Sequence, residues 1–165
     1  MKKTLVGLVL LGLVMGSVNA QDAHRLGVGA NYWTAMDSIK IDEVDDDGFS
    51  YLITYQYRPG LLGLQLDFEF LPDRFGEDAY APAAYVVLGG AIYAAAGIGI
   101  IHQDGDWADD PFYALKVGLD LELLPRIYFD LSASYRFDSK TDLGDAVDKI
   151  DTDTLFLGAA VRFAF

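Results

Sequence analysis

Histidine and cysteine, which often act as catalytic bases and nucleophiles near neutral pH, are scarce in this sequence. It contains two histidines, His24 and His102, and no cysteine. His102 lies in the stretch IHQDGD (101–106), where it could form a general-base pair with Asp104. A hydrolytic site also needs a nucleophile or an activated water, and no serine is adjacent to His102. We therefore favour a solvated loop edge over a catalytic site, and we predict that the protein is not an enzyme.

A second stretch carries ligands that hard cations prefer. EVDDDG (43–48) resembles the start of a calcium-binding loop, but Glu43 stands at the first position and Thr54 at the twelfth, where an EF-hand requires Asp and Glu. A solvated acidic loop is the simpler interpretation, and we predict no cofactor. Weak binding of calcium or magnesium remains an alternative for the acidic residues of two loops, Asp42, Asp45, Asp46, Asp47, Asp104, Asp106, Asp109 and Asp110.

The elements that position these residues are strands, because polar and apolar side chains alternate along most of the chain. In GLQLDFEFL (63–71), leucine and phenylalanine alternate with glutamine, aspartate and glutamate. Period two is the mark of a strand with two unlike faces. The same analysis predicts eight strands, at about 24–36, 49–58, 63–71, 83–90, 91–103, 113–123, 127–137 and 154–165.

The segment from Ala79 to Ile101 contains no charged residue, so its length alone would permit a membrane helix. Gly89-Gly90 interrupts its middle, and Pro82, Gly97 and Gly99 interrupt it elsewhere. Both flanks are acidic, whereas membrane helices are typically flanked asymmetrically by basic residues. Two strands joined by a glycine turn are the better interpretation.

The predicted connections alternate between short and long. Four long loops, 37–48, 72–82, 104–111 and 138–153, contain 19 acidic and 4 basic residues. In an up-and-down barrel these loops all lie on the same side. The sequence therefore predicts a strongly acidic rim at that end.

Charged residues on the polar face are few and nearly balanced in sign, and many of their neighbours are small. An enclosed interior needs this balance, since an unpaired buried charge is costly, whereas a solvated face does not. We predict interior ion pairs among Arg58, Asp67, Glu69, Lys116, Asp120, Glu122, Asp130, Arg136 and Arg162. We expect Arg162 to pair with Asp130, Asp120 or Glu122, and Lys116 and Arg136 to form a second group nearer the long loops.

The apolar face then points outward, into lipid. A soluble ligand-binding barrel would turn this face inward, but the aromatic residues gather at the strand ends, as membrane interfaces favour. Towards the long loops lie Tyr32, Phe49, Tyr51, Phe68, Phe70, Tyr113, Tyr135 and Phe137, and towards the short turns Tyr55, Tyr57, Phe129, Phe163 and Phe165. The fold class predicted is all-β, an eight-stranded antiparallel up-and-down transmembrane β-barrel.

The first twenty residues have the features of a cleaved signal peptide. MKK is followed by the apolar stretch TLVGLVLLGLVMG and by VNA, which suits cleavage. Residues 1–20 are thus expected to be removed, leaving one domain, 21–165. Without Lys2 and Lys3 that domain has 10 basic and 25 acidic residues, a net charge of −15. Such a surface disfavours nucleic acid as a partner.

The signal peptide, the eight alternating strands and the ending VRFAF together resemble the small outer-membrane β-barrels of the OmpA/OmpX type, over the whole of 21–165. The resemblance implies the Gram-negative outer membrane, a barrel without a periplasmic domain, and contact with lipid and lipopolysaccharide. It also implies recognition of Phe163 and Phe165 by the barrel-assembly machinery. We expect a monomer with a structural or interaction role. The alternatives are a narrow pore or a lipid A-modifying enzyme.

Overall fold

The structure is a computed structural model that describes residues 23–35, 47–74, 77–103, 105–137 and 153–165. The signal peptide predicted over 1–20 lies outside the described residues. So do most of the long connections 37–48 and 138–153. The described residues contain no helix that is long and apolar enough to cross a membrane.

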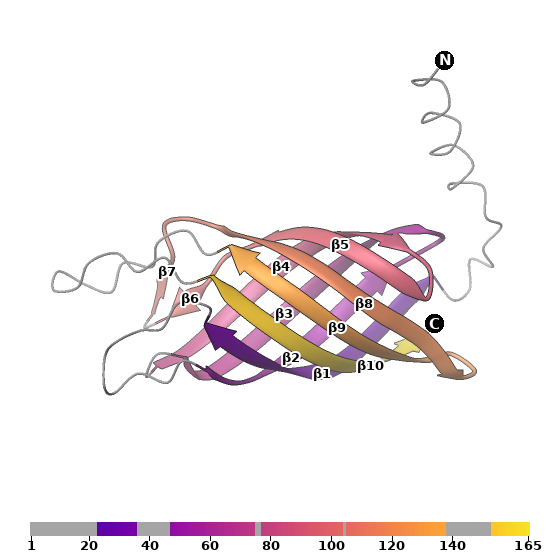
Figure 1. The fold of residues 1–165 in the computed structure, drawn as a ribbon, viewed down its shortest axis with the longest axis horizontal. Coiled ribbons are helices and arrows are strands. Elements are labelled where there is room, and N and C mark those ends of the chain that lie inside the picture. Colours follow the sequence, from indigo (N-terminus) through magenta and orange to yellow (C-terminus); the bar gives the residue numbers. More distant parts are fainter. Residues whose placement is uncertain (1–22, 36–46, 75–76, 104, 138–152) are drawn as a thin grey trace, which may run out of the picture.

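Eight long strands form one closed antiparallel β-barrel (Figure 1). Neighbours along the chain pair with one another, and β1 pairs with β10 to close the ring. A short hairpin, β6 (His102–Gln103) and β7 (Asp106–Trp107), extends from β4. The long strands are β1 (His24–Ala35), β2 (Asp47–Tyr57), β3 (Leu62–Arg74), β4 (Glu77–Gly89), β5 (Ile92–Gly99), β8 (Phe112–Leu124), β9 (Ile127–Phe137) and β10 (Thr154–Ala164). This confirms the predicted fold class.

The barrel has two unlike ends. The short connections 58–61, 90–91 and 125–126 lie at one end with the start of β1 and the C-terminus, and we call it the turn end (Figure 1). The β6–β7 hairpin and the end of β9 lie at the other, the loop end (Figure 1). Residues on one strand therefore have a defined depth along the barrel axis.

The alternation in the sequence maps onto the two faces of the barrel wall. On β3, Leu64, Leu66 and Phe68 are exposed on the outside. Gln65, Asp67 and Glu69 are buried on the inside. The outer surface is therefore apolar, and much of the inner surface is polar.

One predicted loop is largely strand, which corrects the expectation for 72–82. β3 continues to Arg74 and β4 begins at Glu77, and the two strands remain paired as far as Arg74 with Glu77. Proline and acidic residues are uncommon in the interior of strands. Pro82 is nevertheless accommodated, because its carbonyl accepts a bond from the Ile100 amide at 3.1 Å while its missing amide costs the ladder only one bond.

The uncharged segment 79–101 forms strands, as the sequence predicted. β4 and β5 occupy most of it and are joined through Gly89 and Gly90. Gly89 has φ of 135°, a conformation that residues with a Cβ rarely adopt. The Gly90 amide donates to the Ile92 carbonyl at 2.9 Å and closes the turn.

Candidate functional site

The interior at the turn end is organised around one carboxylate, Asp120 on β8. Its oxygens lie 2.5 Å from Arg25 Nη1, 2.8 Å from Arg58 Nη1 and 3.4 Å from Arg162 Nη1. Arg162 also lies 3.1 Å from Asp130 on β9. The cations come from β1, from the turn after β2 and from β10. This Asp120 cluster therefore ties together strands that are far apart in the sequence.

Backbone and aromatic groups hold the arginines of the Asp120 cluster in place. Arg58 donates to the carbonyl of Gly89 at 2.6 Å and also to that of Gly90. The Arg25 guanidinium lies 3.6 Å from the centre of the Tyr128 ring, a cation–π contact. Gly27 makes room for Arg162, because a Cβ on Gly27 would come within 2.7 Å of Arg162 Cγ.

A second polar group lies nearer the loop end. Lys116 on β8 pairs with Asp67 at 2.7 Å, and Arg136 on β9 pairs with Glu69. Glu69 is 1% exposed and also accepts hydrogen bonds from Ser50 and Asn31. Each buried charge in this group thus has an opposite charge beside it, which is the condition for burying it.

Aromatic side chains fill the interior between this second group and the loop end. The Arg136 guanidinium lies 3.9 Å from the centre of the Phe156 ring and 4.7 Å from that of Phe112. Trp33 and Leu71 are buried in the same apolar cluster. The space left beside Lys116 and Arg136 measures about 10 Å³. That is about the room one water molecule needs.

The structure brings together eight of the nine interior residues predicted from the sequence. Arg58, Asp67, Glu69, Lys116, Asp120, Asp130, Arg136 and Arg162 are inside and ion-paired. Arg25 was not predicted, although its position in the alternation of β1, opposite Gln56, indicated the inner face.

Glu122 is the exception and corrects the prediction. Its side chain is exposed and accepts hydrogen bonds from the Arg126 amide and the Tyr128 hydroxyl, at 3.0 and 3.3 Å. The reason is the position of Glu122 along the barrel axis. β8 pairs with β5 only as far as Leu119, so Glu122 projects beyond the edge of its neighbour.

The acid–base and cation-binding candidates are less organised. The His102 ring lies 4.8 Å from the Trp107 ring and 6.4 Å from the Tyr80 ring. Its suggested partner Asp104 lies outside the described residues, as do Asp42, Asp45 and Asp46. The described part of the chain contains no group of three or more side chains that could hold a metal ion.

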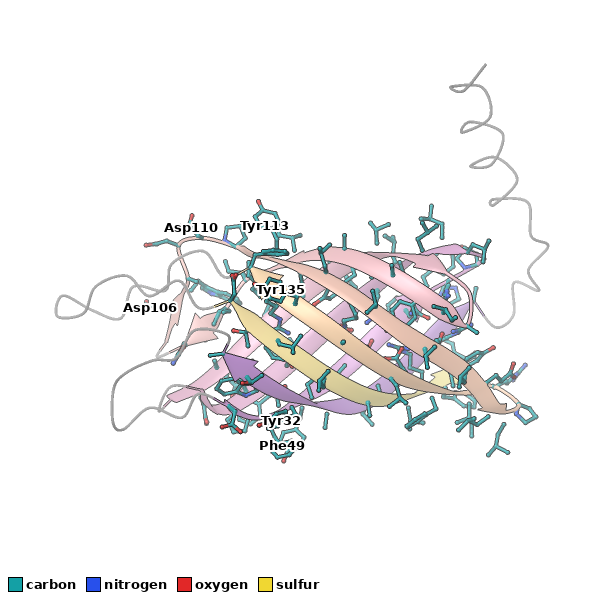
Figure 2. The ribbon with its side chains drawn as sticks, in the orientation of Figure 1. Tyr32, Phe49, Asp106, Asp110, Tyr113 and Tyr135 are labelled. Atoms are coloured by element: carbon teal, nitrogen blue, oxygen red, sulfur yellow. The ribbon has the colours of Figure 1, made fainter. Side chains whose placement is uncertain are left out.

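Aromatic residues surround both ends of the outer surface. At the loop end Tyr32 packs edge-on against Phe49, and its hydroxyl donates to Asp47 at 2.6 Å (Figure 2). At the turn end the Phe165 ring lies 5.9 Å from that of His24, and the Phe165 amide donates to the His24 carbonyl at 2.9 Å. The C-terminal residue therefore lies at the seam where the barrel closes.

Comparisons with known proteins show which class this fold belongs to. No family model and no curated protein matches the sequence. Among solved structures, the crystal structure of Neisserial surface protein A (NspA) has a TM-score of 0.67 at 16% identity, over 87% of this chain and 97% of that one.

Two further structures match with lower TM-scores. The N-terminal β-barrel domain of Pseudomonas aeruginosa OprF has a TM-score of 0.48 at 12% identity, over 86% of this chain and 97% of that one. The Yersinia pestis outer membrane protein Ail in a phospholipid nanodisc has a TM-score of 0.45 at 19% identity, over 84% and 99%. The chain has the fold of the small eight-stranded outer-membrane β-barrels, as its sequence predicted.

Proposed function

We propose that the protein is an integral barrel of the Gram-negative outer membrane with a structural or interaction role, presenting acidic loops to the exterior. One observation carries this proposal: an apolar outer wall surrounds an interior that is filled and charge-paired. The apolar wall requires lipid, since a soluble protein rarely exposes so large an apolar surface. The filled interior supports a role at the exterior over a role in passage through the barrel.

The filled interior argues against the narrow-pore alternative. An eight-stranded barrel has little room beyond its own side chains, and here the Arg136–Phe156 stack and Trp33 occupy the loop half. We expect purified protein in planar bilayers to give no ohmic conductance steps above the protein-free baseline. A general porin reconstituted in parallel is the positive control. Reproducible steps that scale with salt concentration would contradict the proposal.

We propose further that the protein is not an enzyme and acts as a monomer. His102 packs against aromatic rings, and its sequence neighbours supply no nucleophile. A net charge of −15 for residues 21–165 makes nucleic acid an unsuitable partner. Outer-membrane lipid and lipopolysaccharide are the proposed surroundings. Divalent cations could bridge exposed carboxylates such as Asp106, Asp109 and Asp110 to lipopolysaccharide phosphates.

Phe165 and Phe163 are proposed as the signal read by the barrel-assembly machinery. Both side chains are exposed on the outer surface at the turn end, where a partner can reach them. We expect Phe165→Ala to lower the amount of folded protein in the outer membrane of cells several-fold. Refolding of the same variant from urea into detergent should remain efficient, because that process needs no machinery.

Phe137→Ala is the matched control, since Phe137 is an exposed phenylalanine of the outer wall at the loop end. It should assemble in cells at close to the normal level. An assembly defect in cells no larger for Phe165→Ala than for Phe137→Ala would contradict the assignment. So would a refolding defect of Phe165→Ala in detergent that accounts for its loss in cells.

A further inference from the structure

A row of ring-bearing side chains crosses five strands on the outer face at the loop end. Consecutive members are directly opposed pairs, so they share one face of the sheet. From its second member onward, adjacent rings lie 5.2, 6.4 and 4.8 Å apart. The row consists of Tyr51, Phe70, Tyr80, His102 and Trp107.

The last two members of this row belong to the β6–β7 hairpin and not to the closed barrel. The hairpin has two different faces. His102 and Trp107 continue the outer aromatic row, whereas Gln103 and Asp106 pair on the opposite face, in line with the buried Ala79. Figure 2 shows Asp106 at the loop end of the molecule. The hairpin is therefore amphipathic like the adjoining barrel wall, with its aromatic face outward and its polar face inward.

Trp107 is 57% exposed, although it is a large side chain with one polar atom. Such a side chain favours a boundary where its ring is in an apolar medium and its N–H is in a wet one. The aromatic row connects Trp107 directly to side chains of the lipid-facing wall. Continuity with that surface argues for lipid, and not for a protein partner, as the medium that covers Trp107.

We infer that the β6–β7 hairpin lies in the headgroup layer of the outer leaflet, with Trp107 inserted at the boundary between headgroups and acyl chains. This inference rests on the proposed membrane location. The hairpin carries Asp106, and the exposed Asp109 and Asp110 follow it. Carboxylates are tolerated in the hydrated headgroup layer but not in hydrocarbon, so the insertion is shallow.

Fluorescence tests this inference, because Trp33 and Trp107 are the two tryptophans of the chain. In phosphatidylcholine vesicles the emission of Trp107 is obtained by subtracting the spectrum of Trp107→Phe from that of the unmodified protein. Trp33→Phe gives an independent measure, because Trp107 is then the only tryptophan left. We expect lipids brominated near the headgroup to quench Trp107 more than lipids brominated near the chain terminus. We also expect dissolved iodide to quench it less than in the urea-unfolded chain.

A tryptophan placed at position 28 tests the membrane location separately from the position of the β6–β7 hairpin. Val28 is an exposed residue of the outer wall, within β1, and Val28→Trp would be measured with both natural tryptophans replaced by phenylalanine. Absence of bromolipid quenching for this reporter would overturn the membrane location itself. Quenching of the reporter without quenching of Trp107 would overturn only the hairpin inference. Stronger quenching of Trp107 by deep than by shallow bromine would also overturn it.

Discussion

Replacing Asp120 with asparagine is expected to destabilise the folded barrel by about 3–5 kcal/mol, the usual cost of removing one partner from a buried ion pair. Asparagine keeps the size of the side chain but removes the charge that neutralises Arg25, Arg58 and Arg162. Asp130 would remain beside Arg162, so Arg25 and Arg58 would lose the largest share of their compensating negative charge. The loss is measured as a fall in the urea midpoint of protein folded in detergent or bilayers.

Glu122→Gln is the matched control for this substitution. Glu122 lies two residues further along β8 and differs from Asp120 chiefly in being exposed. Its replacement should cost about 0–1 kcal/mol, as for exposed charged groups. Equal urea midpoints for Asp120→Asn and Glu122→Gln would show that the Asp120 cluster does not stabilise the barrel.

The pair Arg162 and Asp130 gives an additional check on the same cluster. Their separation of 3.1 Å makes the two charges one interacting unit. Arg162→Ala with Asp130→Ala should therefore cost less than the sum of the two single substitutions, since the double variant leaves neither charge of this pair uncompensated.

The comparison of Asp120 with Glu122 also shows what sequence alone can predict. Alternation fixes the face on which a side chain lies, so it placed both residues on the polar face. It does not fix depth, which depends on how far the neighbouring strand extends and on the stagger between strands. The same limit left the partners of Arg162 as a set of three. Arg25 was missed for another reason, since the next inward positions of β1 are Gly27 and Gly29, whose lack of a side chain leaves the polar face of this strand poorly marked.

β4 and β5 show a second limit. Their inner face carries Ala81, Tyr85 and Tyr93, so both faces of these strands are apolar or aromatic. The alternation is therefore weak, and neither the start of β4 at Glu77 nor the apolar cluster at the loop end could be derived from it. Strands with one charged face, such as β8 and β9, were placed almost correctly. The bounds of these strands could be predicted because their two faces differ strongly in polarity.

Val117→Arg is expected to destabilise the barrel in lipid bilayers by about 2–4 kcal/mol, as for a basic residue near the bilayer midplane. Val117 is 58% exposed and lies near the middle of β8, directly after Lys116. The two adjacent positions differ in what surrounds them. Lys116 is enclosed and paired with Asp67, whereas a cation at 117 would meet acyl chains.

Tyr113→Arg provides the control at the end of the same strand face. Tyr113 is exposed like Val117 but lies at the loop end, where Figure 2 shows it on the outside of the barrel. Its substitution should cost about 0–1 kcal/mol, because arginine there reaches the interface. The difference in urea midpoint between the two variants reports directly whether hydrocarbon or water surrounds the outer wall. In water an exposed Val117→Arg would cost little, so similar urea midpoints for the two variants in bilayers would exclude hydrocarbon around the middle of β8.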